Sequence, residues 1–365
     1  MYMNKWKKCK LGDALNFRRG HDLPKSSMIE GEVPVAGSNG VIGYHNVSTP
    51  ISPCITIGRS GNVGTPYIYD KCWAHNTVLY IDDYKGNHPR YLYYLLKNLP
   101  LASFGGGSAV PTLNRNHIHP IEISLPPLAE QKRIADILSA IDDKIELNRR
   151  INANLEQQAQ ALYKSWFGEI SSNISLQEIT LNITDGVHNT VKDDCSGEYL
   201  LLSCKNIVGG HLVIGPNERR INKETFDKLR NRTRLSEGDI LVSTVGTVGE
   251  IVILLDPPAN VEFQRSVGII KPNISKASPY YIYCALKDKQ EALKHTAHGA
   301  VQQCIFIGDL KNFEIPYSYS KKLIEFDTIV SPMFNQLTIN HRETNYLTQL
   351  RDTLLPKLMS GEIKI

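Results

Sequence analysis

The sequence lacks the short motifs that most enzymes and small metal-binding domains carry. Its seven cysteines are odd in number and include no Cys-x-x-Cys pair, which argues against both a disulfide framework and a zinc site. No Gly-x-Gly-x-x-Gly and no Gly-Lys-Ser/Thr loop is present, so neither a dinucleotide or methyl-donor pocket nor a phosphate-binding loop is indicated. We therefore predict no catalytic residues and no metal ligands in this chain.

Long apolar segments and a strong excess of one charge are also missing. The N-terminus, MYMNKWKKCK, has no apolar core of a signal peptide, and no apolar run approaches the ~20 residues of a membrane helix. We therefore expect a soluble, cytoplasmic protein of a reducing compartment that makes no membrane contact. The formal net charge of +4 is compatible with binding nucleic acid without requiring it.

The sequence does contain one very long helical pattern near its centre, at residues 125–167. Two prolines precede it, Gly168 follows it, and neither Gly nor Pro interrupts residues 128–167. Apolar residues recur every three or four positions over more than four heptads, which predicts one strand of a coiled coil. The alternative is a long amphipathic helix lying on a core. The predicted seam contains Ile134, Leu138, Ile141, Ile145, Asn148, Asn152, Leu155 and Leu162.

The partner of this helix lies in the same chain. The same order of apolar and polar positions returns near the C-terminus, where Asn340 and Thr344 form the central polar pair. A buried asparagine layer reduces stability but fixes the register, because only one alignment lets the amides pair. We therefore predict that the two stripes pair with each other. The second seam contains Phe326, Val330, Met333, Leu337, Asn340, Leu347 and Leu354.

The repeat extends beyond the helices. Residues 57–64 (IGRSGNVG) are echoed by residues 242–249 (VSTVGTVG), so the chain is a duplication of a globular segment followed by a long helix. At 365 residues, 41% of them hydrophobic, two such domains can each bury a core. The predicted parts are two globular segments and two helices, at residues 1–124, 125–168, 169–318 and 319–365.

The residue pattern of each globular segment predicts a mixed α/β domain. Short β-rich runs alternate with polar, Gly-rich turns that we expect to project from a small sheet. Helices are predicted at residues 89–99 and 278–288. The strand–turn–strand units span residues 32–47, 54–70, 198–215 and 239–256.

The polar turns have the chemistry that recognises base edges in DNA. In the major groove, arginine binds guanine and asparagine binds adenine, each through two hydrogen bonds. Turns of matching type recur in both halves with different residues at their tips, as expected if each half recognises a different sequence. The alternative is that each is only a hairpin turn. The predicted DNA contacts are Arg18, Arg19, Ser38, Asn39, Arg59, Ser60 and Asn62 in the first half, and Lys205, Asn206, Arg219, Arg220, Ser243 and Thr244 in the second.

Two other classes of protein stay open at this point. Residues 256–259 (DPPA) approach the Asp/Asn-Pro-Pro-aromatic motif of amino-methyltransferases, but alanine replaces the ring that stacks on a flipped base. A stand-alone DNA methyltransferase would also need a methyl-donor loop. The other alternative is a coiled-coil scaffold that binds protein through its globular segments.

The helix start LPPLAEQKRI, the duplication and the closing LRDTLLPKLMSGEI (350–363) resemble the specificity subunit of type I restriction-modification systems. The resemblance covers essentially the whole chain. It implies two small α/β target-recognition domains separated by two long helices that form an antiparallel coiled coil. It also implies double-stranded DNA as partner, together with two methyltransferase subunits that carry S-adenosylmethionine and two restriction (motor-nuclease) subunits that use ATP with Mg. The chain itself is then a non-catalytic recognition subunit without a cofactor.

The two helices differ at their starts. Glu130 and Gln131 have no counterpart before the second helix, and Pro332 is expected to interrupt its first turns. The contact with the second methyltransferase subunit is therefore expected to differ from the first. A helix of about 40 residues is roughly 60 Å long, and duplex DNA rises ~3.4 Å per base pair. The implied target is two short sequences around a gap set by the coiled coil.

Overall fold

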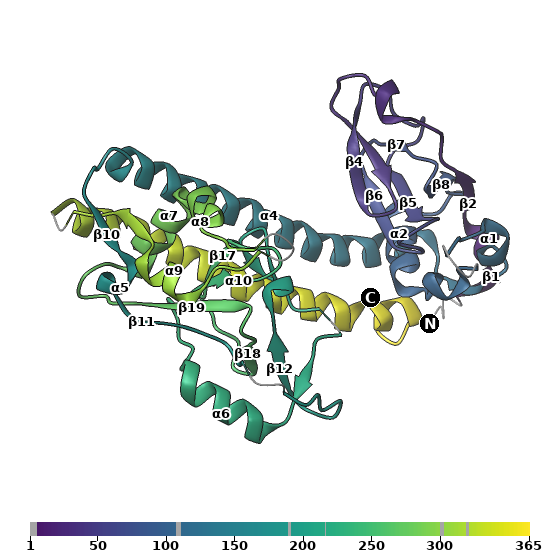
Figure 1. The fold of residues 1–365 in the computed structure, drawn as a ribbon. Coiled ribbons are helices and arrows are strands. Elements are labelled where there is room, and N and C mark those ends of the chain that lie inside the picture. The colour runs from purple at the N-terminus through teal and green to yellow at the C-terminus, as the bar shows by residue number, and fades with distance from the viewer. Residues whose placement is uncertain (1–5, 107–110, 189–190, 216, 300–302, 319–320) are drawn as a thin grey trace. The chain divides into compact units, whose positions relative to one another are not determined.

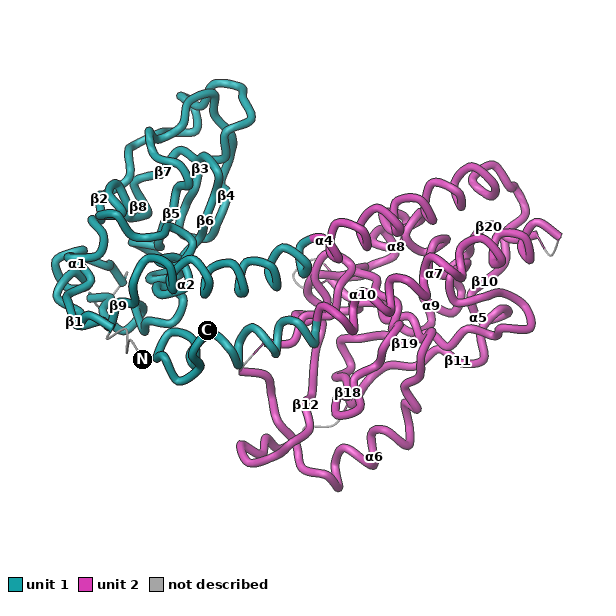
Figure 2. The backbone as a smooth tube through the Cα atoms, turned by 180° about the vertical axis from the view of Figure 1, so that it is seen from behind, with its two compact units in different colours: residues 1–146, 345–365 teal, residues 147–344 magenta. Residues whose placement is uncertain are grey.

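The computed structural model describes residues 6–106, 111–188, 191–215, 217–299, 303–318 and 321–365 (Figure 1). The chain divides into two compact units, which are coloured separately in Figure 2. Unit 1 comprises residues 1–146 and 345–365, and unit 2 comprises residues 147–344. Each unit thus holds one globular segment and a stretch of both long helices. The four-part division drawn from the sequence stays a prediction.

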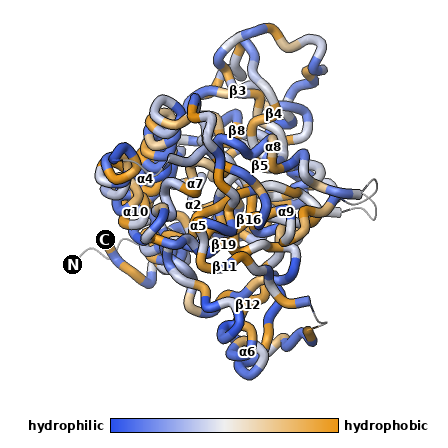
Figure 3. The backbone as a smooth tube through the Cα atoms, turned by 60° about the vertical axis from the view of Figure 1, so that its left-hand side comes forward, coloured by the Kyte–Doolittle hydropathy of each residue, from blue (hydrophilic) through white to orange (hydrophobic). Residues whose placement is uncertain are grey.

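The central helix α4 (Leu128–Phe167) has the bounds that its sequence pattern predicts. It ends where the N–H of Gly168 donates to the Lys164 carbonyl at 3.0 Å. A Cβ at residue 168 would lie 2.5 Å from that carbonyl oxygen, so glycine is required at this stop. Figure 3 shows apolar and polar residues alternating along α4 and α10, as expected for helices with one buried face.

The distal helix α10 (Lys321–Ser360) is continuous, so the expected interruption at Pro332 is wrong. A proline inside a helix removes one backbone hydrogen bond, which tertiary packing can offset. Val330 and Phe334, on either side of Pro332, are 0% and 1% exposed in the core of unit 2. The hydroxyl of Ser331 also donates to the Asp327 carbonyl at 2.6 Å. The buried face therefore holds the helix together through the proline.

In unit 2 the two helices run antiparallel and meet at the predicted polar layer. Asn340 Nδ2 donates to Asn152 Oδ1 at 2.8 Å, and Asn148 Nδ2 donates to Glu343 Oε2 at 2.8 Å. Asn148 is fully buried and Asn340 nearly so. The seam residues that pack into the core of this unit are Leu155, Leu162, Phe326, Val330, Met333 and Leu337.

In unit 1 the same two helices also pair antiparallel. Ile134 and Leu138 near the start of α4 share a core with Leu354 and Leu358 near the end of α10. A cross-helix ion pair joins Arg351 to Asp142, with 2.9 Å between guanidinium and carboxylate. Of the remaining seam positions Ile145 is buried, and Ile141 and Leu347 are half-buried. The predicted mixed α/β fold with an antiparallel coiled coil is confirmed.

The globular segments of the two units share one strand order. Unit 1 has a four-stranded sheet β2-β8-β5-β6 and a three-stranded sheet β4-β3-β7; unit 2 has β11-β19-β16-β17 and β15-β12-β18. In each three-stranded sheet the middle strand has one parallel and one antiparallel neighbour. The pairs β1-β9 and β10-β20 also correspond. The repeat seen in the sequence is therefore a repeat of topology.

The predicted strands and helices are confirmed except at residues 198–215, where strand β12 is followed by a 3-10 turn and by a short separate hairpin of β13 and β14. The strands of unit 1 are β1 (Lys7–Lys10), β2 (Asn16–Arg19), β3 (Val33–Gly37), β4 (Gly40–His45), β5 (Cys54–Gly58), β6 (Pro66–Tyr69), β7 (Trp73–Ala74), β8 (Val78–Asp83) and β9 (Glu122–Leu125). Those of unit 2 are β10 (Asn173–Ser175), β11 (Thr180–Asp185), β12 (Tyr199–Leu202), β13 (Ile207–Val208), β14 (His211–Leu212), β15 (Arg220–Ile221), β16 (Ile240–Ser243), β17 (Ile251–Ile253), β18 (Val261–Phe263), β19 (Val267–Pro272) and β20 (Glu314–Pro316). The shorter helices are α1 (Leu11–Ala14), α2 (Pro89–Asn98), α3 (Arg115–Ile118), α5 (Leu176–Ile179), α6 (Lys223–Thr233), α7 (Pro279–Asp288), α8 (Gln290–His295) and α9 (Ile307–Asn312).

The echo between residues 57–64 and 242–249 is an echo of backbone conformation. Gly61 and Gly64 have φ of +82° and +80°, and Gly246 and Gly249 have φ of +77° and +78°. Side chains other than glycine rarely adopt these angles, so the turn after β5 and the turn after β16 need glycine at the same two places. The residues between the glycines are free to differ.

Glu130 and Gln131 anchor the globular segment of unit 1 to α4. Gln131 is 2% exposed; its Oε1 accepts the backbone N–H of His88 at 2.9 Å, while Glu130 Oε1 accepts the Trp6 indole N–H at 3.2 Å. In unit 2 the hydroxyl of Ser278 donates instead to Asp327 of α10. His88 and Ser278 are the N-cap residues of the equivalent helices α2 and α7. The missing Glu-Gln pair is therefore replaced by another anchor, and a different methyltransferase contact stays a prediction.

Candidate nucleic-acid interface

Three of the predicted residues of unit 1 line one open pocket of about 930 Å³. Arg18 and Arg19 end β2, and Arg59 follows β5. Both strands pair with β8, which brings their ends together at one edge of the sheet. Arg115, the first residue of α3, lines the same pocket and was not predicted. The shared neighbour β8 thus gathers residues that are far apart in the sequence.

Positive charge dominates this pocket. Arg18 lies 3.9 Å from Asp82 and Arg19 lies 3.7 Å from Asp22, and these long ion pairs join mostly exposed groups. Such pairs hold little energy, so the guanidinium groups can exchange them for other acceptors. Within the described ranges, Arg59 makes no side-chain hydrogen bond or ion pair. Its five donors are available to a ligand.

The neighbouring predicted residues of unit 1 lie at the turns beside this pocket. The side chain of Ser38 packs against Gly58 and Gly61, so the turn between β3 and β4 touches the turn after β5. Asn39 and Asn62 are exposed, and Asn62 Oδ1 accepts the Thr65 hydroxyl at 3.1 Å. The half-buried residue Ser60 forms an isolated β-bridge with Thr112.

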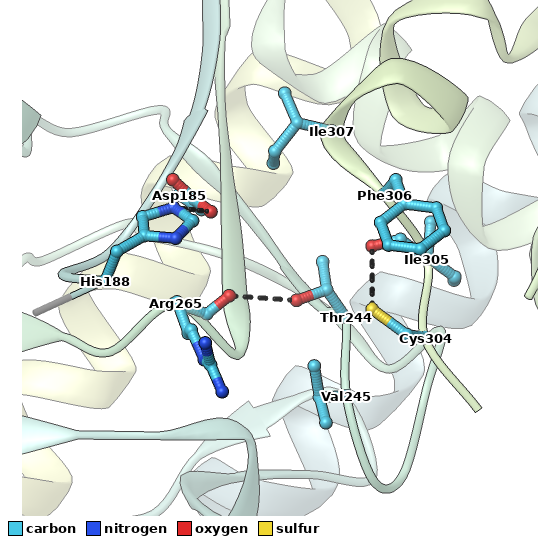
Figure 4. Close-up of a pocket in the computed structure, with 9 residues that line it drawn as sticks. All are labelled: Asp185, His188, Thr244, Val245, Arg265, Cys304, Ile305, Phe306 and Ile307. Atoms are coloured by element: carbon cyan, nitrogen blue, oxygen red, sulfur yellow. Dashed lines mark hydrogen bonds and ion pairs between the residues drawn. The ribbon is translucent and has the colours of Figure 1, made fainter. Parts of the chain in front are cut away.

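Unit 2 has a pocket of about 400 Å³ at the equivalent place (Figure 4). The Leu113 N–H donates to the Arg59 carbonyl at 2.7 Å, and correspondingly the Ile305 N–H donates to the Thr244 carbonyl at 2.9 Å. A β-bridge joins Val245 to Cys304 just as one joins residues 60 and 112 in unit 1. Thr244 therefore occupies the position of Arg59, and the two pockets are built from the same turns.

The second pocket differs in chemistry from the first. Figure 4 shows His188 and Arg265 on one side and Phe306 on the other. One carboxylate oxygen of Asp185 lies 2.6 Å from His188 Nε2, and the other lies 2.9 Å from a guanidinium nitrogen of Arg232. Among the described residues, the exposed guanidinium of Arg265 has no partner. The ring of Phe306 is 56% exposed. One free cation thus faces a largely apolar wall.

The other predicted residues of unit 2 are engaged within their own loops. Thr244 is 3% exposed and donates to the Arg265 carbonyl at 3.2 Å, and Ser243 is fully buried and accepts the Glu250 N–H at 2.8 Å. Asn206, 2% exposed, donates to the Val213 carbonyl at 2.9 Å. The remaining three make polar contacts at the surface: Lys205 with Glu218 at 2.9 Å, Arg219 with Asp193 at 2.6 Å, and Arg220 with the Gly197 carbonyl at 3.1 Å. DNA contacts by these residues stay predictions.

Several residues that line the two pockets were missed from the sequence. Trp73 and His21 lie at the first pocket, with their ring centroids 5.5 Å apart. Arg265 lies at the second pocket and at an adjoining pocket of about 320 Å³, which Arg219 also lines. No local motif of the sequence marks Trp73, His21 or Arg265, because the order of the strands brings them to the pockets.

No group of three His, Cys, Asp or Glu side chains gathers at metal-binding distance in the part of the chain that the structure describes. No helix of that part combines the length and the apolar character needed to cross a bilayer.

Comparison with known proteins agrees with this architecture. Residues 3–157 match the family model of the type I restriction modification DNA specificity domain. The MjaIX specificity subunit of Methanocaldococcus jannaschii is 24% identical over 301 residues, which is 75% of this chain and 69% of that protein. The HindI specificity subunit of Haemophilus influenzae is 24% identical over 331 residues, 69% of this chain and 71% of that protein.

A solved structure shares the whole fold. The S subunit of a type I restriction-modification system from M. genitalium superposes with a TM-score of 0.60 at 19% identity, covering 98% of this chain and 97% of that one. Duplicated α/β domains, equivalent surface pockets and a paired set of long helices define a two-domain protein built on a coiled coil. In sequence and in fold the chain is thus similar to type I restriction-modification specificity subunits.

Proposed function

We propose that this chain is the DNA-recognition subunit of a type I restriction-modification enzyme. It binds a bipartite target in double-stranded DNA, one half-site through each globular segment. The pair of equivalent pockets supports this most strongly, because the same turns form both while one is lined by arginines and the other has an apolar wall. Two pockets that are built from the same turns but lined by different side chains are suited to binding two different short DNA sequences.

The long helices set the distance between the half-sites in this proposal. Each has 40 residues and is therefore ~60 Å long at ~1.5 Å per residue. The bases in between are not contacted by this chain. The paired amides of Asn152 and Asn340 fix the helix register, and thus the length of the gap.

Catalysis belongs to partner subunits in this proposal. Two methyltransferase subunits bring S-adenosylmethionine, and in the complete enzyme two restriction subunits bring ATP with Mg. This chain positions them in the cytoplasm and needs no cofactor of its own. Leu147 and Ile151, one turn apart on α4, are 48% and 37% exposed and offer an apolar contact for a partner.

The test uses the purified chain with and without its methyltransferase subunits. We expect selective binding of some duplexes from a random pool, with affinity falling ~10³–10⁵ between 50 and 200 mM salt if ~6–10 phosphates are contacted. Methyl transfer from labelled donor should require the partner. A flat salt response without sequence preference would instead indicate a protein-binding scaffold, and transfer by the chain alone would indicate a stand-alone methyltransferase.

A further inference from the structure

The pocket of unit 2 has exchanged polar side chains for apolar ones at matched positions. Asn114 and Phe306 are the N-cap residues of the equivalent helices α3 and α9. Given the shared hydrogen bond and β-bridge described above, Val245 replaces Ser60, and Ile307 replaces Arg115. Three positions that are polar in one unit are thus apolar in the other.

These apolar side chains form one wall of the pocket rather than a closed core. Ile305 at its base is 2% exposed, whereas Val245 and Ile307 are half-buried and Phe306 is 56% exposed. The ring of Phe306 stacks on His298, with centroids 5.3 Å apart and an interplanar angle of 29°. This contact holds the ring at the pocket rim, where Phe306 stays largely exposed. An apolar surface held open in this way is suited to an apolar group of a ligand.

Among the base edges in the major groove, thymine alone carries an apolar group, its 5-methyl. A phenylalanine or a small aliphatic side chain is the usual protein contact for that methyl group. Arg265, which faces the wall across the pocket, can donate hydrogen bonds to a neighbouring base or phosphate (Figure 4). The pocket of unit 1 carries arginines at its rim, including Arg59 and Arg115, and suits guanine instead.

We propose that the wall formed by Val245, Phe306 and Ile307 binds the 5-methyl group of a thymine, so that the half-site of unit 2 contains a required thymine. This inference rests on the proposed function, since it names the base that one of the two pockets recognises. It makes Val245, Phe306 and Ile307 specificity-determining residues.

The experiment uses the full chain with its methyltransferase subunits and the duplex that it selects from a random pool. The half-site that Arg59→Ala leaves unchanged is assigned to unit 2. Each thymine of that half-site is replaced in turn by uracil, which removes only the methyl group. At one position we expect the affinity to fall about fourfold, the effect of one buried methyl.

Phe306→Ala is the matched protein variant. Because Phe306 is 56% exposed, the substitution removes no core packing. It should bind the thymine and uracil duplexes equally, with its thermal unfolding and its recognition of the other half-site unchanged. Leu181→Ala, also at an exposed apolar residue of unit 2 (72%), should keep the fourfold discrimination.

The failures of the two proposals can be told apart. If no sequence-selective duplex is recovered, the proposed function fails. If such a duplex is recovered but its second half-site lacks thymine, tolerates uracil throughout, or is discriminated equally well by Phe306→Ala, the thymine pocket alone is refuted.

Discussion

Asn340 of α10 donates a hydrogen bond from Nδ2 to Oδ1 of Asn152 on α4, at 2.8 Å. Both residues lie in the interface between the two helices, where a buried amide without a partner would cost more than the bond contributes. The pair therefore selects one alignment of the helices over those shifted by a turn. Under the proposed function, this alignment would also set the spacing of the two half-sites.

Removing one member of this pair should lower the stability of the fold more than removing both. We expect Asn152→Leu to lower the free energy of unfolding by about 1–3 kcal/mol, since the nearly buried Asn340 amide then loses its partner. The double variant Asn152→Leu/Asn340→Leu should recover most of the loss. Urea unfolding of the four proteins gives the coupling energy, and strict additivity of the two single effects would contradict the pairing.

Arg59→Ala should affect individual positions of one half-site. A bidentate contact to a base contributes ~1–3 kcal/mol of discrimination, and that preference should relax while others persist. Lys71→Ala, at another exposed cation of unit 1, is the matched control for lost charge. Binding to a panel of single-base variants separates the outcomes: an equal loss for every sequence would make Arg59 a phosphate contact only.

The buried ion pair of unit 2 gives a prediction for stability and its pH dependence. Glu262 is fully buried and lies 2.6 Å from Arg230, and burial raises the pKa of its carboxyl although the nearby guanidinium lowers it. Arg230→Ala should cost about 3 kcal/mol near neutral pH, because it leaves a buried carboxylate unpaired. A raised pKa favours the folded state at low pH, so this deficit should shrink as the pH falls through the raised pKa of Glu262.

Chemical unfolding at several pH values checks this expectation. Lys228→Ala on the same helix removes an ion pair with Glu224 in which both side chains are mostly exposed, and it should have almost no effect. A deficit of Arg230→Ala that is independent of pH would show that lost packing, and not the stranded carboxylate, is responsible.

The fragment of residues 1–170 should form a dimer. It loses Leu355, Leu358 and Met359, which complete the core of unit 1, and exposes the seam of α4. Because the two seams share one pattern, a second copy can bury that seam antiparallel, with a two-fold axis. With methyltransferase subunits, the dimer should methylate a palindrome of the first half-site.

Replacing Ile141 and Ile145 by Asp should abolish both the dimer and its activity, since each substitution places an unpaired charge in the interface. Sedimentation measures the association state. A folded, monodisperse monomer of the unsubstituted fragment would contradict the shared pairing, and methylation of a non-palindromic site would contradict the two-fold symmetry alone.

The long helices could be predicted from the sequence because their signals are local. The heptad pattern, the flanking prolines and Gly168 give the bounds of α4, and the repeated polar layer identifies its partner. The pockets could be predicted only in part. Arg115 and Arg265 reach them through the order of the strands, which periodicity does not encode. The interruption expected at Pro332 was a wrong prediction, because tertiary packing of the neighbouring residues keeps α10 intact and a local rule does not include it.

Exchange of one recognition domain tests the central claim most directly. Residues 1–124 are replaced by the corresponding segment of a relative with a known target, and the methylated sequences of a host expressing the chimera and its methyltransferase are mapped. If each globular segment recognises its own half-site, one half-site changes to that of the donor while the other half-site and the gap are retained. Alteration of both half-sites, or of neither, would contradict the account.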